Sequence, residues 1–256
     1  MCGRYASRTT PGELAHLYDV PSDGAKAHDL GERYNVAPTD QIYAVLDRTD
    51  PENPGETRRE LHDVRWGLVP SWSRDPSIGT RAINARIETL GQKPMFRKAF
   101  QQRRCIIPAD GYYEWVQRID EAGRKYKQPF WLHPAANTGP LSFAGLYEFW
   151  PDPSKPEDAP DRWLWSATII TCAATGPAGE VHDRTPFVIP DDRIDAWLDP
   201  RMKDPDEIAP VMARVQPPLL GVREVSTRVN KVGNEGPELI VPLSEAEPVV
   251  QLRRAA

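Results

Sequence analysis

The chain has 256 residues, of which 27% are charged and 39% hydrophobic, and it carries a net charge of −5. This length allows one large domain or two small ones with a sizeable core. The net charge argues against a protein that coats nucleic acid nonspecifically, although it permits a local basic groove, since phosphate contacts depend on local charge.

The first predicted element is a short helix near the amino end. The stretch Thr10-Pro11-Gly12-Glu13 has the form of a capping box with proline in the first turn. In this helix we expect Leu14, Leu17 and Tyr18 to face inward.

Strands dominate the rest of the chain, and the 27 prolines favour short strands and loops over long helices. Alternating apolar and polar residues predict a strand at 41–47. Further strands are predicted at 61–69, 104–107, 112–118, 125–133, 142–149 and 163–172. A polar loop at 50–57 separates the first two. The sequence Asp120-Glu121-Ala122-Gly123 predicts a hairpin turn between the fourth and fifth.

Short helices and surface segments complete the prediction. Helices are expected at 94–99, 191–198 and 205–213, and the proline-rich, acidic residues 151–161 predict a mobile surface loop. The sequence contains no repeat and no compositional break. We therefore predict one α+β domain over residues 2–244, with a curved, mainly antiparallel β-sheet, a barrel-like core and short peripheral helices. Residues 245–256 would form a flexible tail.

Cysteine and targeting patterns bear on the compartment. No apolar run approaches the ~20 residues that span a bilayer, and the amino end lacks the pattern of a secretory signal. Cys2, Cys105 and Cys172 form neither a disulfide framework nor a zinc-ligand spacing. We expect no membrane association, no metal, no cofactor and a reducing cytoplasm.

Cys2 is the most informative position in the chain. A small second residue usually permits removal of Met1, which would leave Cys2 with a free α-amine and a thiol on adjacent carbons. Both groups are partly nucleophilic at neutral pH, because their usual pKa values lie near ~8 and ~8.5. Together they can condense with an aldehyde, first as an imine and then as a five-membered thiazolidine. The alternative is a small residue at a frayed terminus.

Five stretches place polar or charged groups beside aromatic residues, glycine or proline, as pocket walls do. They are Arg33-Tyr34-Asn35-Val36-Ala37-Pro38, Ile83-Asn84-Ala85-Arg86-Ile87-Glu88-Thr89, Pro108-Ala109-Asp110-Gly111-Tyr112-Tyr113-Glu114-Trp115, Val181-His182-Asp183-Arg184-Thr185-Pro186 and Val229-Asn230-Lys231-Val232-Gly233-Asn234. Taken singly, each is a weak signal.

Single residues in these stretches also have ordinary interpretations. Glu114 could point to solvent from a strand, whereas burial among its aromatic neighbours would raise its pKa. His182 could be a surface or capping histidine, and Asn35 could shape a pocket. A basic cluster, interpreted as a solvated helix face, comprises Arg97, Lys98, Arg103 and Arg104.

Taken together and in order, these stretches resemble the SRAP family of abasic-site processing proteins. The matching segments are Met-Cys-Gly-Arg-Tyr at the start, residues 33–38, Trp66-Gly67-Leu68-Val69-Pro70 with Trp72, residues 83–89, residues 109–115 and residues 182–186. The resemblance covers nearly the whole chain without departure at a key position, and residues 151–161 look like a variable insertion.

The resemblance implies capture of abasic sites in single-stranded DNA. A lost base leaves a deoxyribose whose open form carries an aldehyde at C1′, and a thiazolidine DNA–protein crosslink at Cys2 would shield this lesion from strand cleavage and error-prone bypass. The family is associated with the SOS response and was first described as a peptidase. Crosslinking, lyase and autoproteolytic peptidase activities are therefore expected.

The matching positions imply four residues of a reaction centre. Cys2 would be the nucleophile, and Asn84 would hold the linkage through an amide that donates and accepts without adding charge. His182 would transfer the proton at O4′ when the sugar ring opens. Glu114 would shuttle a proton as water leaves the carbinolamine.

Four further positions are expected to bind the DNA strand. Arg4, Arg86 and Arg184 would clamp phosphates that flank the lesion, because planar guanidinium forks suit phosphate better than lysine. Trp72 would stack on an exposed base, or else belong to the core. The expected partner is single-stranded DNA with abasic sites, and replication-fork proteins are candidate partners. We expect a monomer in the cytoplasm that is nucleoid-associated when bound to DNA.

Three other functions fit parts of the pattern. Class II glutamine amidotransferases also begin Met-Cys-Gly and use the α-amine of the terminal cysteine as base, although Arg4 stands where they usually have an aliphatic residue. A peptidase would use Cys2, His182 and Glu114 on its own amino end or on other chains. A non-catalytic reader of single-stranded or junction DNA would leave Cys2 without a chemical role.

Overall fold

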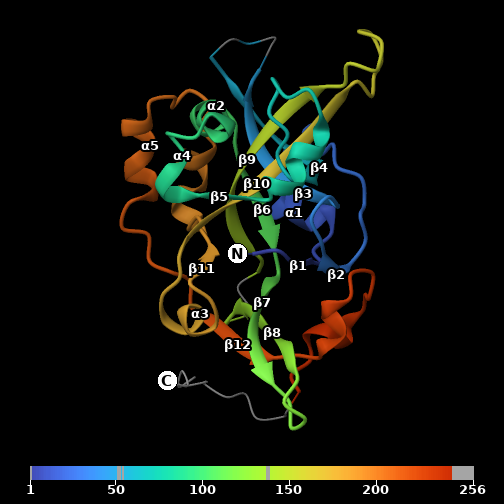
Figure 1. Ribbon diagram of the computed structural model, residues 1–256. Coiled ribbons are helices and arrows are strands. Elements are labelled where there is room, and N and C mark those ends of the chain that lie inside the picture. The colour runs from blue at the N-terminus through green and yellow to red at the C-terminus, as the bar shows by residue number, and fades with distance from the viewer. Residues whose placement is uncertain (1, 51–52, 54, 137–138, 244–256) are drawn as a thin grey trace.

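Two β-sheets organise the chain (Figure 1). The computed structural model describes residues 2–50, 53, 55–136 and 139–243. One sheet has five strands in the order β12-β8-β7-β1-β2. The other has seven, in which β11-β10-β4-β3-β6-β9 follow one another and β5 pairs with β10. The predicted α+β class with a curved, mainly antiparallel, barrel-like core is confirmed.

The strands of each sheet come from distant parts of the sequence. The five-stranded sheet contains β1 (Tyr5–Ser7), β2 (Arg33–Val36), β7 (Gly111–Ile119), β8 (Lys125–Pro134) and β12 (Leu220–Glu224). The seven-stranded sheet contains β3 (Gln41–Thr49), β4 (Thr57–Trp66), β5 (Asn84–Arg86), β6 (Arg104–Ala109), β9 (Leu141–Pro151), β10 (Trp163–Ala173) and β11 (Arg184–Pro186).

The seven-stranded sheet closes on itself. β9, the last strand in this order, pairs antiparallel with β10, from Gly145 opposite Ile169 to Pro151 opposite Trp163. The ring β10-β4-β3-β6-β9 therefore has no open edge within it, and its alternate side chains fill the interior. The order is mainly antiparallel, with parallel pairings of β10 to β4 and β5.

The amino end of the chain is held between the two sheets. The ring of Tyr5 on β1 meets the rings of Trp66 and Phe143 edge-on, with centroids 5.3 and 6.3 Å away. Cys2 belongs to the same buried cluster. The contacts of the Tyr5 ring fix where the preceding residues lie.

All seven predicted strands are present, and most extend beyond the predicted range. The second ends earlier than expected, at Trp66, because Gly67 has a φ of 125° and its backbone lies against Gly79. The hairpin turn is confirmed, since the Asp120 N–H donates to the Arg124 carbonyl. The sequence analysis missed the short strands β1, β2, β5, β11 and β12.

The helices are short and peripheral, as predicted. They are α1 (Pro11–Leu17), α2 (Pro94–Gln102), α3 (Gly176–Val181), α4 (Ile194–Leu198) and α5 (Pro205–Met212). In Figure 1, α2, α4 and α5 lie together on one side of the barrel, and α2 and α4 contact β6. The predicted helix at 191–198 is a 3₁₀ turn at Asp191–Arg193 followed by α4.

The capping box of α1 is confirmed, because the Thr10 side chain accepts from the Glu13 N–H and Glu13 accepts from the Thr10 N–H. Leu14 and Tyr18 are buried as expected. The expectation for Leu17 is wrong, since 49% of this residue is exposed. It ends the helix at the rim of a surface hollow, so the core contact passes to Tyr18.

The interpretation of the basic cluster as a solvated face is wrong for Arg104. This residue is buried, and its guanidinium donates to the carbonyl oxygens of Phe100, Gln101, Trp197, Asp199 and Met202. Burial lowers its pKa to about 10. Arg104 therefore joins β6 to the segment that contains α4.

Part of the domain prediction falls outside the described residues, namely the tail at 245–256 and positions 51, 52 and 54 of the polar loop. Residues 151–161 form turns at the surface, where Lys155 pairs with Asp161. Across the described ranges, no helix is long and apolar enough to cross a membrane.

Candidate functional site

Cys2 lies beside Asn84 on β5. The Asn84 Nδ2–H donates to the Cys2 carbonyl at 2.6 Å. Within the described part of the chain, Asn84 Oδ1 is buried and has no hydrogen-bond partner. The pairing of β5 with β10 carries Asn84 to this position, which joins two of the four residues predicted for the reaction centre.

Glu114 reaches Cys2 from β7. Antiparallel pairing sets Tyr5 opposite Tyr112, and the Tyr113 N–H donates to the Arg4 carbonyl, so the residues before β1 run alongside Glu114. Only 3% of Glu114 is exposed, which excludes the interpretation that it points to solvent. Burial raises the pKa of Glu114 to about 7, as its aromatic neighbours suggested.

The thiol of Cys2 is fully buried. Burial raises the pKa of this thiol well above its usual value, and the charge of Glu114 raises it further. In the folded protein the thiol of Cys2 is therefore protonated at neutral pH.

His182 follows α3 directly and caps its carboxyl end. The Arg184 backbone N–H donates to His182 Nδ1 at 3.0 Å, which leaves the proton of a neutral imidazole on Nε2. The Asp183 carboxylate lies 2.9 Å from Nδ1 but is mostly exposed. Burial lowers the pKa of His182, so the neutral form predominates at neutral pH.

Tyr112 links the strand of Glu114 to the segment of His182, and the sequence analysis did not single it out. Its hydroxyl lies 2.8 Å from the Thr185 hydroxyl. Burial raises the pKa of Tyr112, and the charges of Cys2 and Glu114 add to this effect. The charge of Asp183, next to His182, also raises the pKa of Glu114. Asn84 thus contacts Cys2 directly, β7 runs alongside the amino end with Glu114, and Tyr112 joins β7 to the segment that follows His182.

Arg86 and Arg184 lie on opposite sides of β10, since Arg86 pairs with Thr171 and Arg184 pairs with Ala173. Arg184 is already engaged: its guanidinium binds Glu88 through two hydrogen bonds of 2.6 and 3.0 Å and donates to the Thr171 carbonyl. Arg86 is exposed, and its side chain makes no hydrogen bond or ion pair with another described residue. The two predicted clamps therefore differ in availability.

Trp72 lies at the surface, where 61% of the residue is exposed. This excludes the alternative that it belongs to the core. It follows the segment from Trp66 to Pro70, which is anchored to β10 because the Gly67 N–H donates to the Ala167 carbonyl and the Val69 N–H to the Ser166 hydroxyl. An exposed ring on an anchored segment is suited to stacking.

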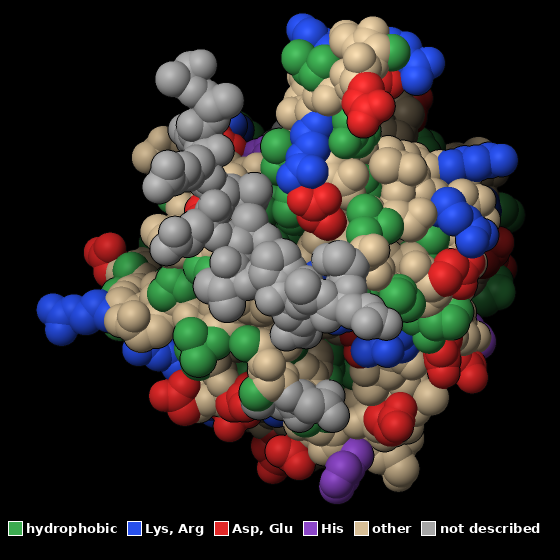
Figure 2. All heavy atoms as spheres, turned by 90° about the horizontal axis from the view of Figure 1, so that it is seen from below, with side chains coloured by type: hydrophobic (Ala, Val, Ile, Leu, Met, Phe, Trp, Pro, Cys, Tyr) green, Lys and Arg blue, Asp and Glu red, His purple; other side chains and the backbone are tan. Residues whose placement is uncertain are grey.

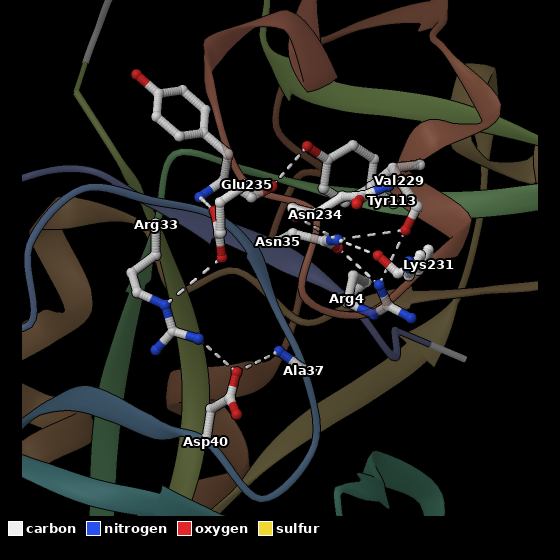
Figure 3. Close-up of polar contacts among 11 residues, drawn as sticks. Arg4, Arg33, Asn35, Ala37, Asp40, Tyr113, Val229, Lys231, Asn234 and Glu235 are labelled. Carbon is white, nitrogen blue, oxygen red and sulfur yellow. Dashed lines mark hydrogen bonds and ion pairs between the residues drawn. The ribbon is translucent and has the colours of Figure 1, made fainter.

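Arg4 is half-buried against the loop at 229–234 (Figure 3). Its Nη1 donates to Asn35 Oδ1 at 2.6 Å and to the Val229 carbonyl at 3.0 Å. Its guanidinium carbon lies 5.8 Å from the ring centroid of Trp115. Asn35 therefore contacts Arg4, and no hydrogen bond joins it to Cys2 among the described residues.

Charge on the face seen in Figure 2 is mixed. Among the described side chains visible there, Lys and Arg alternate with Asp and Glu without an extended basic block. This agrees with the net charge of −5 and directs attention to single arginines rather than to a broad patch. In the same described residues, no group of three or more His, Cys, Asp or Glu side chains is placed to bind a metal ion.

Comparison with known proteins places this geometry in a family. The family model described as SOS response associated peptidase, SRAP, matches residues 1–232. This chain belongs to the SRAP family. A Bacillus subtilis relative named abasic site processing protein YoqW is 35% identical over 240 residues, which cover 94% of this chain and 99% of that protein. The Escherichia coli abasic site processing protein YedK is 32% identical over 251 residues, which cover 95% of this chain and all of that protein.

The SRAP fold also occurs among solved structures. A crystal structure of a Bacteroides thetaiotaomicron protein superposes with a TM-score of 0.72 at 22% identity, over 94% of this chain and 99% of that one. At this identity the likeness concerns the fold.

Proposed function

We propose that this SRAP protein captures abasic sites in single-stranded DNA by forming a thiazolidine through Cys2 after removal of Met1. The placement of buried Glu114 beside Cys2 carries this proposal, because it sets a group that can exchange protons at neutral pH next to an aminothiol. The names of the relatives, which are abasic site processing proteins, support the same substrate.

The chemistry balances with loss of one water. The α-amine of Cys2 adds to the C1′ aldehyde, and the resulting carbinolamine loses water to give an imine. The thiol then adds to the imine carbon: sulfur bonds to C1′, and the thiol proton ends on the ring nitrogen. Because the buried thiol is protonated, the amine attacks first, and the thiol needs a base when it adds.

Glu114 and His182 are suited to different proton transfers. With a pKa near 7, Glu114 can donate a proton to the departing water and accept one from the Cys2 thiol. The neutral His182 carries its proton on Nε2, so it can donate to O4′ as the sugar ring opens. Asn84 donates to the Cys2 carbonyl through Nδ2. Its Oδ1 can accept a hydrogen bond from the N–H of the thiazolidine ring.

The DNA strand is proposed to contact the four predicted positions in different ways. Exposed Trp72 stacks on a base, and exposed Arg86 meets a phosphate directly. Arg184 binds a phosphate by exchanging it for Glu88, whose side chain is half-exposed. Arg4 offers the nitrogen that its internal contacts leave available.

One assay tests the function. The purified protein is incubated with single-stranded DNA that holds one abasic site and is analysed on a denaturing gel. A heat-stable shifted band is expected for the wild type and for the control Cys172→Ala, and it should be absent for Cys2→Ala. Binding without a covalent band in the wild type would favour a non-catalytic reader.

A second candidate function is cleavage of the Met1–Cys2 bond by the protein itself. The observation that favours it is that β7, which carries Glu114, runs alongside the amino end and is joined through Tyr112 to the segment that follows His182. Glu114 and His182 are groups that can transfer protons during hydrolysis of a peptide bond. Intact mass after expression tests it. Retention of Met1 in Glu114→Gln but not in the wild type would support self-cleavage, and complete removal in both would oppose it.

A further inference from the structure

Asn35 holds Arg4 and the loop at 229–234 with one amide group. Only 2% of Asn35 is exposed. Its Oδ1 accepts from Arg4 Nη1, and its Nδ2 donates to the carbonyls of Val229, Lys231 and Asn234 at 3.3, 3.2 and 2.9 Å (Figure 3). The two halves of the amide therefore make different contacts: the acceptor orients Arg4, and the donor gathers the loop.

The loop is shaped to present these carbonyls. Gly233 has a φ of 94°, a conformation that side chains rarely adopt, and this lets the chain curl around Asn35. Glu235 then fixes the loop on β2, where it accepts from the Tyr34 N–H at 2.7 Å and lies 3.7 Å from Arg33. The Tyr113 hydroxyl donates to the Tyr34 carbonyl from β7. Three segments distant in sequence are thus joined behind Arg4.

The guanidinium of Arg4 is held through Nη1, and Nη2 is the nitrogen that can bind a ligand. Nη1 has two acceptors, Asn35 Oδ1 and the Val229 carbonyl, whereas Nη2 has no hydrogen-bond partner among the described residues. The guanidinium lies over the Trp115 ring, and the Trp115 Nε1–H donates to Asn230 Oδ1 at 2.6 Å. These contacts fix the plane of the guanidinium, and since Nε is buried, they leave Nη2 for an anion.

We propose that Asn35 is a positioning residue for DNA binding: it orients Arg4 so that Nη2 meets a backbone phosphate, and it locks the 229–234 loop behind that contact. The inference rests on the proposed function, in which Arg4 binds a phosphate. The exposed Lys231 lies on the same loop and brings a second positive charge to this side of the site.

The amide of asparagine suits position 35 better than other side chains of similar or smaller size. Aspartate would keep the acceptor for Arg4 but set a carboxylate against three carbonyls, and alanine would lose both halves. Serine keeps one donor and one acceptor on a shorter stem. Asn35→Ala is therefore the main variant, and Asn35→Ser replaces it in the same measurements if the alanine protein does not fold.

The test is binding of an intact single strand without an abasic site, measured as a function of salt. For Asn35→Ala we expect an affinity about five- to tenfold lower at low salt, and a salt slope smaller by about 0.7, the value for one phosphate contact on a single strand. Arg4→Ala should give the same slope, and the double variant should be no worse than Arg4→Ala alone, because Asn35 acts through Arg4.

The matched control is Asn234→Ala. It removes the bond from Asn234 Nδ2 to the Arg228 carbonyl, which also holds this loop, but leaves the Arg4 contact in place. We expect the wild-type salt slope for this variant. A normal slope for Asn35→Ala or Asn35→Ser, or full additivity with Arg4→Ala, would overturn the inference even if crosslinking proceeds. Absence of a Cys2-dependent crosslink with the slopes as expected would instead refute only the proposed chemistry.

Discussion

The residues around Cys2 and the arginines proposed to bind DNA differ in their environment. Cys2 and Glu114 are buried and His182 is partly buried, and burial shifts the pKa of each. The arginines differ in what they already bind: Arg184 is paired with Glu88, whereas Arg86 is exposed. Burial thus sets the pKa values of the groups proposed to react. The ion pairs that the arginines already make determine which of them can bind a phosphate directly.

The largest effect is expected for a substitution of Glu114, which should change the rate of crosslinking but not the affinity for DNA. Glu114→Gln removes the proton exchange but keeps the size and polarity of the side chain, so we expect crosslinking to slow by about 100-fold or more. Affinity for an intact single strand should change less than twofold. The measurement pairs single-turnover crosslinking with equilibrium binding, and an equal loss in both would place Glu114 in DNA binding instead.

The second effect concerns stability and its dependence on pH. Glu114 has a pKa of about 7 in the folded protein against 4.5 ordinarily. Between these values the folded state keeps a proton that the unfolded state has released, so the stability contributed by this group falls as pH rises. Above pH ~7 the buried charge costs up to about 3 kcal/mol.

Glu114→Gln should therefore be more stable than the wild type at pH 8, with the difference vanishing below about pH 4.5. Denaturant unfolding at a series of pH values measures this. A variant that is less stable than the wild type at every pH would contradict the raised pKa of Glu114.

The smallest effect concerns the arginine that is already paired. Glu88→Ala releases Arg184 while its bond to the Thr171 carbonyl keeps the side chain in place. We expect an intact single strand to bind about two- to threefold more tightly, with a salt slope steeper by about 0.7.

The control for Glu88→Ala is Asp161→Ala, which removes the same charge from the exposed ion pair with Lys155 in the loop at 151–161. Equal gains in both variants would mean that net charge, rather than the release of Arg184, accounts for the tighter binding.

Local signals in the sequence predicted local structure. The capping box of Thr10 and Glu13 needs four consecutive residues, and β3 is long enough for alternation to show in its sequence. The strand β1, with three residues, is too short for such a pattern and forms because β2 and β7 flank it. Leu17 was misplaced because the helix ends at that residue.

Residues of the site were predictable to the extent that their neighbours in sequence create their environment. Glu114 lies among aromatic residues, so its raised pKa could be anticipated. The contacts of Arg104 with Trp197 and of Arg184 with Glu88 could not, because these partners lie 93 and 96 residues away along the chain. The contact of Asn35 with Arg4 likewise depends on a loop that is 194 residues away.

The most direct test of the account is the intact mass of the crosslinked product. We predict an adduct of the chain without Met1 and the abasic strand, less one water, with the attachment mapped to Cys2. An adduct on a chain that retains Met1, or attachment at any other residue, would contradict it.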